Sequence, residues 1–147
     1  MLKTIILAVL IALSSATQTN PKVVPLGAIL AQPYSIELAT QPGYVGEEGI
    51  AKAIFKPIRG FEWNKDYPAS FRIKTKDFPI AVPLKTKSGR SEFKINDKGA
   101  ILCVPFKGKE TGRIQVEGLV SFSVCNEKEC LVFRNQELTL TFIVLKK

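Results

Sequence analysis

The sequence contains no histidine among its 147 residues. Serine and cysteine hydrolases that depend on a His general base are therefore excluded, and so are the usual imidazole-containing zinc sites. We expect neither a hydrolase nor a metalloenzyme, and we predict no cofactor and no metal ligand in this chain.

Hydrophobic runs are also short. The apolar run over residues 5–13 follows the basic start Met1-Leu2-Lys3 and falls well below the roughly 20 residues that a membrane-spanning helix needs. Small residues at Ser14 and Ala16 are typical of a signal-peptidase site after Ala16. We predict a signal peptide over residues 1–16, a flexible lead-in over 17–32 and one domain over 33–147, exported to the periplasm without membrane insertion.

Acidic residues are outnumbered by basic ones, 13 to 21, which gives a formal net charge of +8. The positive residues are scattered along the chain, and Arg72, Lys74 and Lys76 alternate as they would on the solvated face of a strand. The sequence has no RNA-binding motif that combines aromatic and basic residues, and no basic helix. We therefore predict no nucleic-acid partner, although a basic exported protein can attract acidic partners.

Helical periodicity is absent, and short alternating runs separated by Gly, Pro and Asn turns take its place. The last of these runs places Leu138, Leu140, Phe142 and Val144 on one face. Residues 100–106 are almost all apolar and predict a buried central strand. Together the runs predict an all-β fold, an immunoglobulin-like antiparallel β-sandwich. The earlier expected strands cover residues 34–38, 50–55, 71–74, 92–95, 100–106 and 114–124.

Cysteine is scarce, and two of the three cysteines lie close together. Cys125 and Cys130 are separated by four residues at the junction of two strand-like runs, so a hairpin would bring them within disulfide range. An exported chain meets an oxidising compartment, and we predict a disulfide between them. Closing so small a ring contributes only about 2–3 kcal/mol, and the spacing alone leaves open whether the bond is a structural brace or an exchangeable redox pair.

The charges in the predicted loop favour exchange. Glu127 and Glu129 flank Lys128 beside the two cysteines. Net negative surroundings disfavour a thiolate, and a pair whose reduced form lacks thiolate stabilisation tends to be a reducing one. Such a pair suits a protein that donates electrons.

Three further residues have two interpretations each. Cys103 lies in the apolar run 101–104, where we expect a small buried hydrophobe; an intermolecular bridge or a resolving role is the alternative. Phe61 and Trp63 are expected to pack in the core or at its rim, and contact with the cysteine loop or a partner is their alternative.

Two segments resemble the amino-terminal periplasmic domain of the thiol:disulfide interchange protein DsbD and its stand-alone relatives. Residues 121–130 are similar to the family's strand, paired-cysteine loop and strand; they read Ser-Phe-Ser-Val-Cys-Asn-Glu-Lys-Glu-Cys. Residues 56–68 resemble the family's Pro-x-x-Gly-aromatic segment that leads to Asn and Tyr-Pro. The resemblance extends loosely over residues 33–145 and implies an immunoglobulin-like fold.

The resemblance also implies a function. Cys125 and Cys130 would be the catalytic pair, with Cys130 forming the mixed disulfide and Cys125 resolving it. Electrons would pass from a membrane-embedded thiol reductase to periplasmic thioredoxin-like proteins. The family shields its disulfide with a cap loop that carries an aromatic residue, whereas the corresponding residues 85–92 contain none. The alternative function is a non-catalytic secreted β-sandwich that binds another protein and uses the disulfide only as a brace.

Overall fold

The computed structural model describes residues 32–84 and 92–147, and the regular elements in these ranges are all strands. Three predicted segments lie wholly or mostly outside the described residues: the signal peptide over 1–16, the lead-in over 17–32 except for residue 32, and the cap segment over 85–92 except for residue 92. The strands are β1 (Tyr34–Gln41), β2 (Gly43–Tyr44), β3 (Glu48–Pro57), β4 (Glu62–Trp63), β5 (Ser70–Ile73), β6 (Ala81–Pro83), β7 (Glu92–Asn96), β8 (Gly99–Gly108), β9 (Gly112–Cys125) and β10 (Cys130–Leu145).

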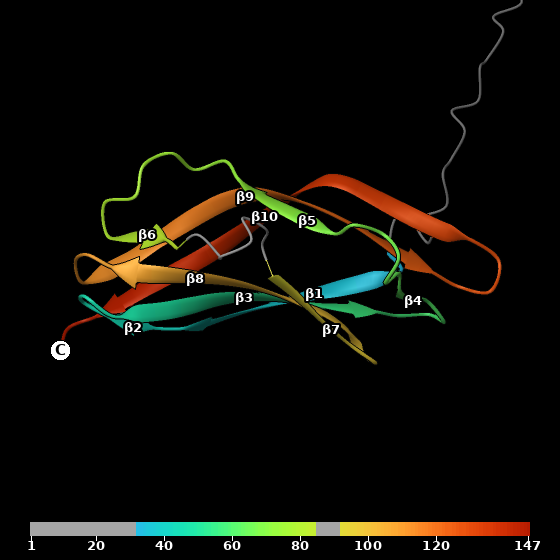
Figure 1. Ribbon diagram of the computed structural model, residues 1–147, viewed down its shortest axis with the longest axis horizontal. Coiled ribbons are helices and arrows are strands. Elements are labelled where there is room, and N and C mark those ends of the chain that lie inside the picture. Colours follow the sequence, from blue (N-terminus) through green and yellow to red (C-terminus); the bar gives the residue numbers. More distant parts are fainter. Residues whose placement is uncertain (1–31, 85–91) are drawn as a thin grey trace, which may run out of the picture. The chain divides into compact units, whose positions relative to one another are not determined.

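The strands form two five-stranded sheets (Figure 1). One sheet has the order β1-β3-β8-β6, with β7 also paired to β8. The other has the order β2-β10-β9-β4, with β5 also paired to β9. All named pairs are antiparallel except the short pairing of β2 with β10. The predicted all-β sandwich is therefore confirmed, while the immunoglobulin-like assignment stays a prediction.

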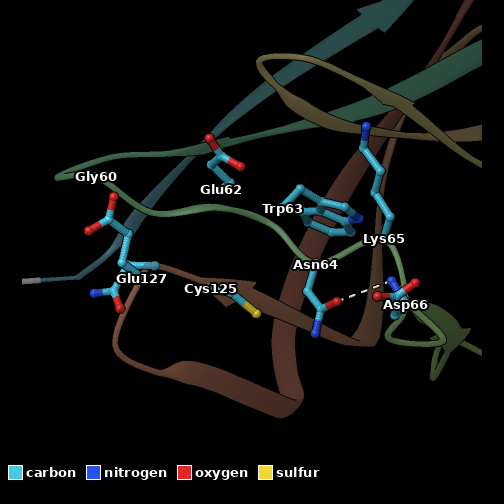
Figure 2. Close-up of a pocket in the computed structure, with 9 residues that line it drawn as sticks. Gly60, Glu62, Trp63, Asn64, Lys65, Asp66, Cys125 and Glu127 are labelled. Carbon is cyan, nitrogen blue, oxygen red and sulfur yellow. Dashed lines mark hydrogen bonds between the residues drawn. The ribbon is translucent and has the colours of Figure 1, made fainter.

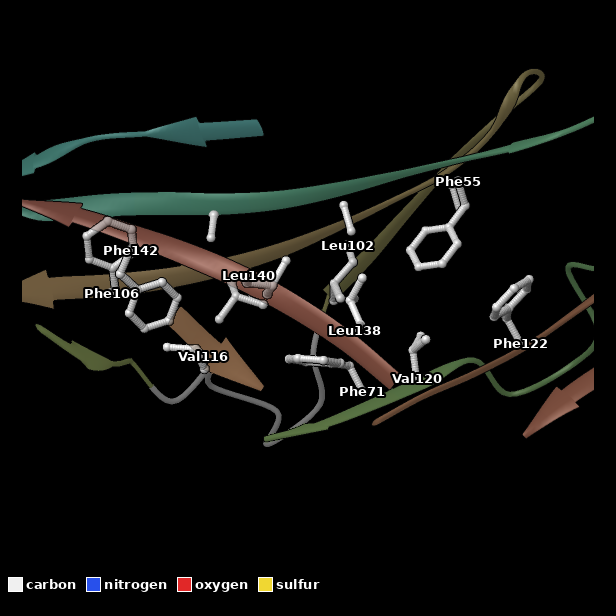
Figure 3. Close-up of a cluster of buried hydrophobic side chains, with 14 of the residues drawn as sticks. Phe55, Phe71, Leu102, Phe106, Val116, Val120, Phe122, Leu138, Leu140 and Phe142 are labelled. Carbon is white, nitrogen blue, oxygen red and sulfur yellow. The ribbon is translucent and has the colours of Figure 1, made fainter. Parts of the chain in front are cut away.

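The core lies between the two sheets because every second side chain of each long strand is apolar and points inward (Figure 3). In β9 these residues are Val116, Val120, Phe122 and Val124, all fully buried, as the alternation in the sequence predicts. The last strand buries Leu138, Leu140, Phe142 and Val144, also as predicted. The opposing sheet contributes residues of β3 and β8, including Phe55, Leu102 and Phe106.

The prediction for residues 100–106 is right about position and wrong about burial. This segment is the middle of β8, which has neighbours on both edges. Only one parity is buried, however, because the sheet packs on one face: Leu102 and Val104 point into the core, whereas Ile101 and Cys103 are half-buried on the other face. The interpretation of Cys103 as a core hydrophobe is therefore wrong.

Candidate functional site: the cysteine hairpin

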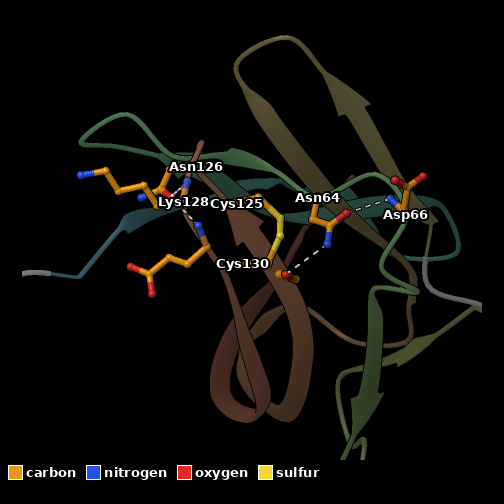
Figure 4. The surroundings of a disulfide bond; sticks show 8 residues. Asn64, Asp66, Cys125, Asn126, Lys128 and Cys130 are labelled. Carbon is orange, nitrogen blue, oxygen red and sulfur yellow. Dashed lines mark hydrogen bonds between the residues drawn. A yellow bond between two sulfur atoms is a disulfide. The ribbon is translucent and has the colours of Figure 1, made fainter.

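The predicted disulfide is present at the tip of the β9–β10 hairpin (Figure 4). Cys125 and Cys130 are directly opposite each other in the ladder, and their Cα atoms are 4.0 Å apart. This separation is close to the ~4.5 Å of a non-hydrogen-bonded antiparallel pair. The bond thus joins two residues that the ladder already holds opposite each other. We call Cys125, the loop residues 126–129 and Cys130 the cysteine hairpin.

The loop of the cysteine hairpin is organised by Asn126. Its backbone N–H donates to the carbonyl of Glu129 at 2.9 Å, and its side-chain Oδ1 accepts from the backbone N–H groups of Lys128 and Glu129, both at 2.8 Å. An Asx turn of this kind closes the hairpin independently of the disulfide. The turn therefore joins the ends of the two strands in addition to the disulfide.

The two cysteines differ in accessibility. Cys130 is exposed, while Cys125 is half-buried beside β4. The difference follows from the pairing, because Cys125 lies on β9 between β4 and β10, whereas β2, the outer neighbour of β10, pairs only with Val144 and Leu145 and does not reach Cys130. Solvent therefore reaches Cys130 more readily than Cys125.

A polar clamp holds β4 against β9 beside the disulfide. The Asn64 backbone N–H donates to the carbonyl of Ser123 at 3.0 Å, and its Nδ2 donates to the Ser123 Oγ at 3.3 Å. Its Oδ1 accepts from the backbone N–H of Asp66 at 3.1 Å, which fixes the orientation of the amide because a backbone N–H can only donate. Figure 4 shows the Asn64 side chain beside the Cys125–Cys130 bond.

Ser123 could not be singled out from the sequence. It follows the core residue Phe122, and side chains alternate along a strand, so its side chain would be expected to face solvent. It is fully buried because the segment that contains Asn64 covers this part of β9. Asn64 could be found in the sequence only as part of the family-like segment 56–68.

Of the two aromatic residues near the hairpin, Trp63 packs in the core and Phe61 at its rim, as expected. Trp63 is 6% exposed and stacks on Phe122 with ring centroids 5.4 Å apart and an interplanar angle of 4°. Phe61 is half-buried against the same cluster. The indole Nε1 of Trp63 is buried and has no hydrogen-bond partner, and among the described residues it is the sole buried side-chain nitrogen or oxygen in this condition. Trp63 is therefore a buried aromatic residue that lies close to Cys125.

An open groove of about 620 Å³ runs beside the disulfide (Figure 2). It is lined on one side by residues of the segment 60–66 and on the other by Cys125, Asn126 and Glu127. Its charged groups are the carboxylates of Glu62, Asp66 and Glu127 and the single ammonium group of Lys65. The groove is thus negative in a protein whose net charge is +8. We call it the acidic groove.

The third cysteine lies apart from this site. Cys103 is a free thiol on β8, in the other sheet, where it pairs with Lys52 of β3 and Glu92 of β7. The structure therefore brings together Cys125 and Cys130 and does not add Cys103 to them.

Comparison with known proteins adds no relative: no protein-family model, curated protein or solved structure matches the chain. Within residues 32–84 and 92–147 no cluster of three or more potential His, Cys, Asp or Glu ligands could hold a metal ion. The same part of the chain contains no helix long and apolar enough to cross a membrane. The chemistry of this site is that of the two sulfurs and the polar groups around them.

Proposed function

We propose that this protein is a periplasmic thiol–disulfide carrier that passes electrons through a reversible Cys125–Cys130 disulfide. It would receive electrons from a membrane-embedded thiol reductase and deliver them to thioredoxin-like proteins. The observation that carries the proposal is the position of the bond: it joins an exposed cysteine, on a part of β10 that β2 does not reach, to a half-buried one on the adjacent strand. The similarity of residues 121–130 and 56–68 to the DsbD amino-terminal domain supports it.

The exchange requires one nucleophile and one resolving thiol. In the reduced protein, the Cys130 thiolate attacks a sulfur of the partner's disulfide, and a mixed disulfide forms as the partner's other sulfur leaves and takes up a proton. The Cys125 thiolate then attacks the Cys130 Sγ, and the partner's second thiolate leaves and is protonated. Two electrons and two protons reach the partner, and the Cys125–Cys130 bond is restored.

The accessibility of the two cysteines matches these roles. Cys130 is exposed to an incoming disulfide, while Cys125 stays beside it in the ladder and is positioned to resolve the intermediate. The carboxylates of the acidic groove disfavour thiolates nearby, which makes the pair a better electron donor.

The test is trapping of the mixed disulfide with an oxidised thioredoxin. All variants carry Cys103→Ala, so that the free thiol on β8 cannot contribute. Cys125→Ala is expected to form a covalent complex that dithiothreitol dissolves, because Cys130 attacks and this chain keeps no thiol to resolve the product. Acid quenching traps the complex before the leaving thiol of thioredoxin can reverse the attack. The matched variant Cys130→Ala is expected to yield no complex. If Cys125→Ala also yields none, the protein has no exchange mechanism of this kind.

The alternative is a binding module braced by the disulfide, and the ordered Asx turn of Asn126 together with the acidic groove supports it. In that case, replacing both cysteines by alanine lowers the free energy of unfolding, and neither single variant captures thioredoxin. The trapping experiment therefore separates the two functions.

A further inference from the structure

Beside the disulfide, no strand of residues 32–84 or 92–147 pairs with the outer edge of β10. The Asn126 N–H bonds the Glu129 carbonyl, and in an antiparallel ladder hydrogen-bonded and non-hydrogen-bonded pairs alternate. The pairs Cys125–Cys130 and Ser123–Val132 are therefore both non-hydrogen-bonded. In such pairs the N–H and C=O groups point away from the partner strand. The backbone groups of Cys130 and Val132 accordingly point to the side of β10 opposite β9.

The bond between β9 and the segment that follows β4 agrees with this register. The Ser123 carbonyl accepts from the Asn64 N–H of the segment that follows β4, so it too points away from β10. Beyond the register shift between Phe133 and Gln136, the Thr141 carbonyl accepts from the Thr40 Oγ1 and points away from β9.

No described strand uses the edge next to the disulfide. The outer neighbour of β10 is β2, and it pairs only with Val144 and Leu145. Val132 is 45% exposed, so the edge is open to an incoming chain as well as unpaired. The accessible cysteine thus lies on a free sheet edge.

The available edge is short. The pairing of β9 with β10 shifts register between Phe133 and Gln136, and within that bulge Asn135 has a φ of 51°. The Asn135 N–H donates to the Ser121 Oγ at 3.0 Å. Bulges interrupt the regular array of edge groups and limit uncontrolled strand pairing. The regular edge from Cys130 therefore has room for only a few residues.

We propose that the thioredoxin-like acceptor docks by adding an extended segment to this edge, so that its backbone pairs with Cys130 and Val132. The inference rests on the proposed function and specifies how the partner is held. Adjacent strands lie about 4.7–4.9 Å apart, which falls inside the ~4.4–6.8 Å Cα separation of disulfides. A partner cysteine held beside the added segment at this spacing from Cys130 is therefore within reach of the Cys130 sulfur. Backbone pairing leaves the partner's side chains largely unspecified, which suits a carrier that serves several proteins.

The test removes one donor from the edge. Val132→Pro eliminates the outward N–H and leaves the pairing with β9 intact, because that N–H does not bond β9, and edge strands accept proline at such positions. We expect the second-order rate of exchange between the reduced protein and oxidised thioredoxin to fall about tenfold. Exchange with oxidised dithiothreitol, which needs no docking, is expected to stay within twofold of the wild-type rate.

Two controls isolate the backbone effect. Val132→Ala shortens the side chain and keeps the N–H, and we expect it to exchange with thioredoxin at close to the wild-type rate. Thr139→Pro removes an outward N–H from the same edge far from the cysteines, since Thr139 lies two residues before Thr141 in an uninterrupted register. It is expected to leave the exchange rate unchanged.

The outcomes separate this inference from the proposed function. A wild-type protein that exchanges with dithiothreitol and never with thioredoxin contradicts the carrier function itself. A wild-type protein that exchanges with thioredoxin while Val132→Pro does so equally fast overturns only the edge-docking proposal. Equal losses in Val132→Ala and Val132→Pro overturn it as well, because the side chain would then be the contact. If Val132→Pro instead abolishes a concentration-dependent dimer in analytical ultracentrifugation, the edge binds a second copy of the chain and the proposal is wrong.

Discussion

At the end of the sandwich away from the cysteines, Phe106 stacks on Phe142 with ring centroids 4.4 Å apart, and Gly108 lies against Val144 and the backbone of Tyr44. At the cysteine end, Trp63 stacks on Phe122 in much the same way, but a buried Nε1 is left without a partner and an open groove runs beside the stack. Both ends thus have an aromatic stack, and only one of them is tightly closed.

The comparison shows how one core can serve two purposes. The Gly108 end is closely packed, with no room for an added methyl group at Gly108, and the Gly108 backbone also bonds Gly46 and Glu47. The cysteine end combines the same kind of packing with a polar clamp, a disulfide and a free strand edge. Changes at the first end should affect stability without affecting exchange, and changes at the second should separate the two properties.

The largest effect is expected at the Trp63–Phe122 stack. Trp63→Ala leaves a large cavity and should lower the free energy of unfolding by about 3–5 kcal/mol. Trp63→Phe keeps an aromatic ring and removes the unpartnered N–H, so we expect a loss of less than about 1.5 kcal/mol. Urea denaturation of the oxidised proteins measures both. Equal losses in the two variants would show that the indole N–H has a stabilising partner.

The next effect lies at the closed end. A Cβ at Gly108 would lie 2.6 Å from the Val144 Cγ1 and 2.8 Å from the Tyr44 carbonyl oxygen, so Gly108→Ala should lower the free energy of unfolding by about 1–3 kcal/mol. Thioredoxin exchange by the folded protein should not change. Adding Val144→Ala should relieve only the side-chain part of the clash. A slower exchange in Gly108→Ala would contradict the independence of the two ends.

A smaller effect is expected from the polar clamp. Asn64→Ala leaves the buried Ser123 hydroxyl without its partner and should lower the free energy of unfolding by about 1–2 kcal/mol. Ser123→Ala removes that hydroxyl, so adding it to Asn64→Ala should cost little more. Urea denaturation of the two single variants and the double variant forms a double-mutant cycle. Strictly additive losses would contradict a direct bond between these side chains.

The smallest effect is a pH dependence at the cysteine end. Tyr34 packs edge-on against Phe122 and Phe133, and its burial raises the pKa of the phenol above the ordinary value of 10.0. The unfolded chain therefore loses this proton first as the pH rises, so the Tyr34 contribution to stability is present below about pH 10 and is lost above it. The stability of Tyr34→Phe should fall less steeply than that of the wild type over this range. Parallel pH profiles would contradict the assignment.

The sequence allowed most of the long strands to be predicted because they bury one face. The alternation of Val116, Val120, Phe122 and Val124 defines β9, and the two cysteines mark the turn to β10. The short strand β4 was not predicted, since a two-residue strand shows no periodicity. It is held by the burial of Trp63 and by the bonds of Asn64, which depend on residues distant in sequence.

The errors also have physical causes. Cys103 was assigned to the core because its neighbours are apolar, yet hydrophobic residues on the outer face of a sheet can be half-buried by adjacent strands. Ser123 was overlooked because alternation assigns it to solvent, while a segment almost sixty residues earlier in the chain covers it. The register that frees the backbone of Cys130 could be recognised only once the pairing of β9 and β10 was known.

The central claim is that the Cys125–Cys130 bond is exchangeable, and its reduction potential tests this most directly. The mature protein would be equilibrated in defined thiol–disulfide buffers, alkylated, and analysed by mass shift, with Cys103→Ala as the background. The carrier function predicts a potential above about −300 mV, with the reduced protein still folded. A much lower potential, or reduction only on unfolding, would contradict it and identify the disulfide as a structural brace.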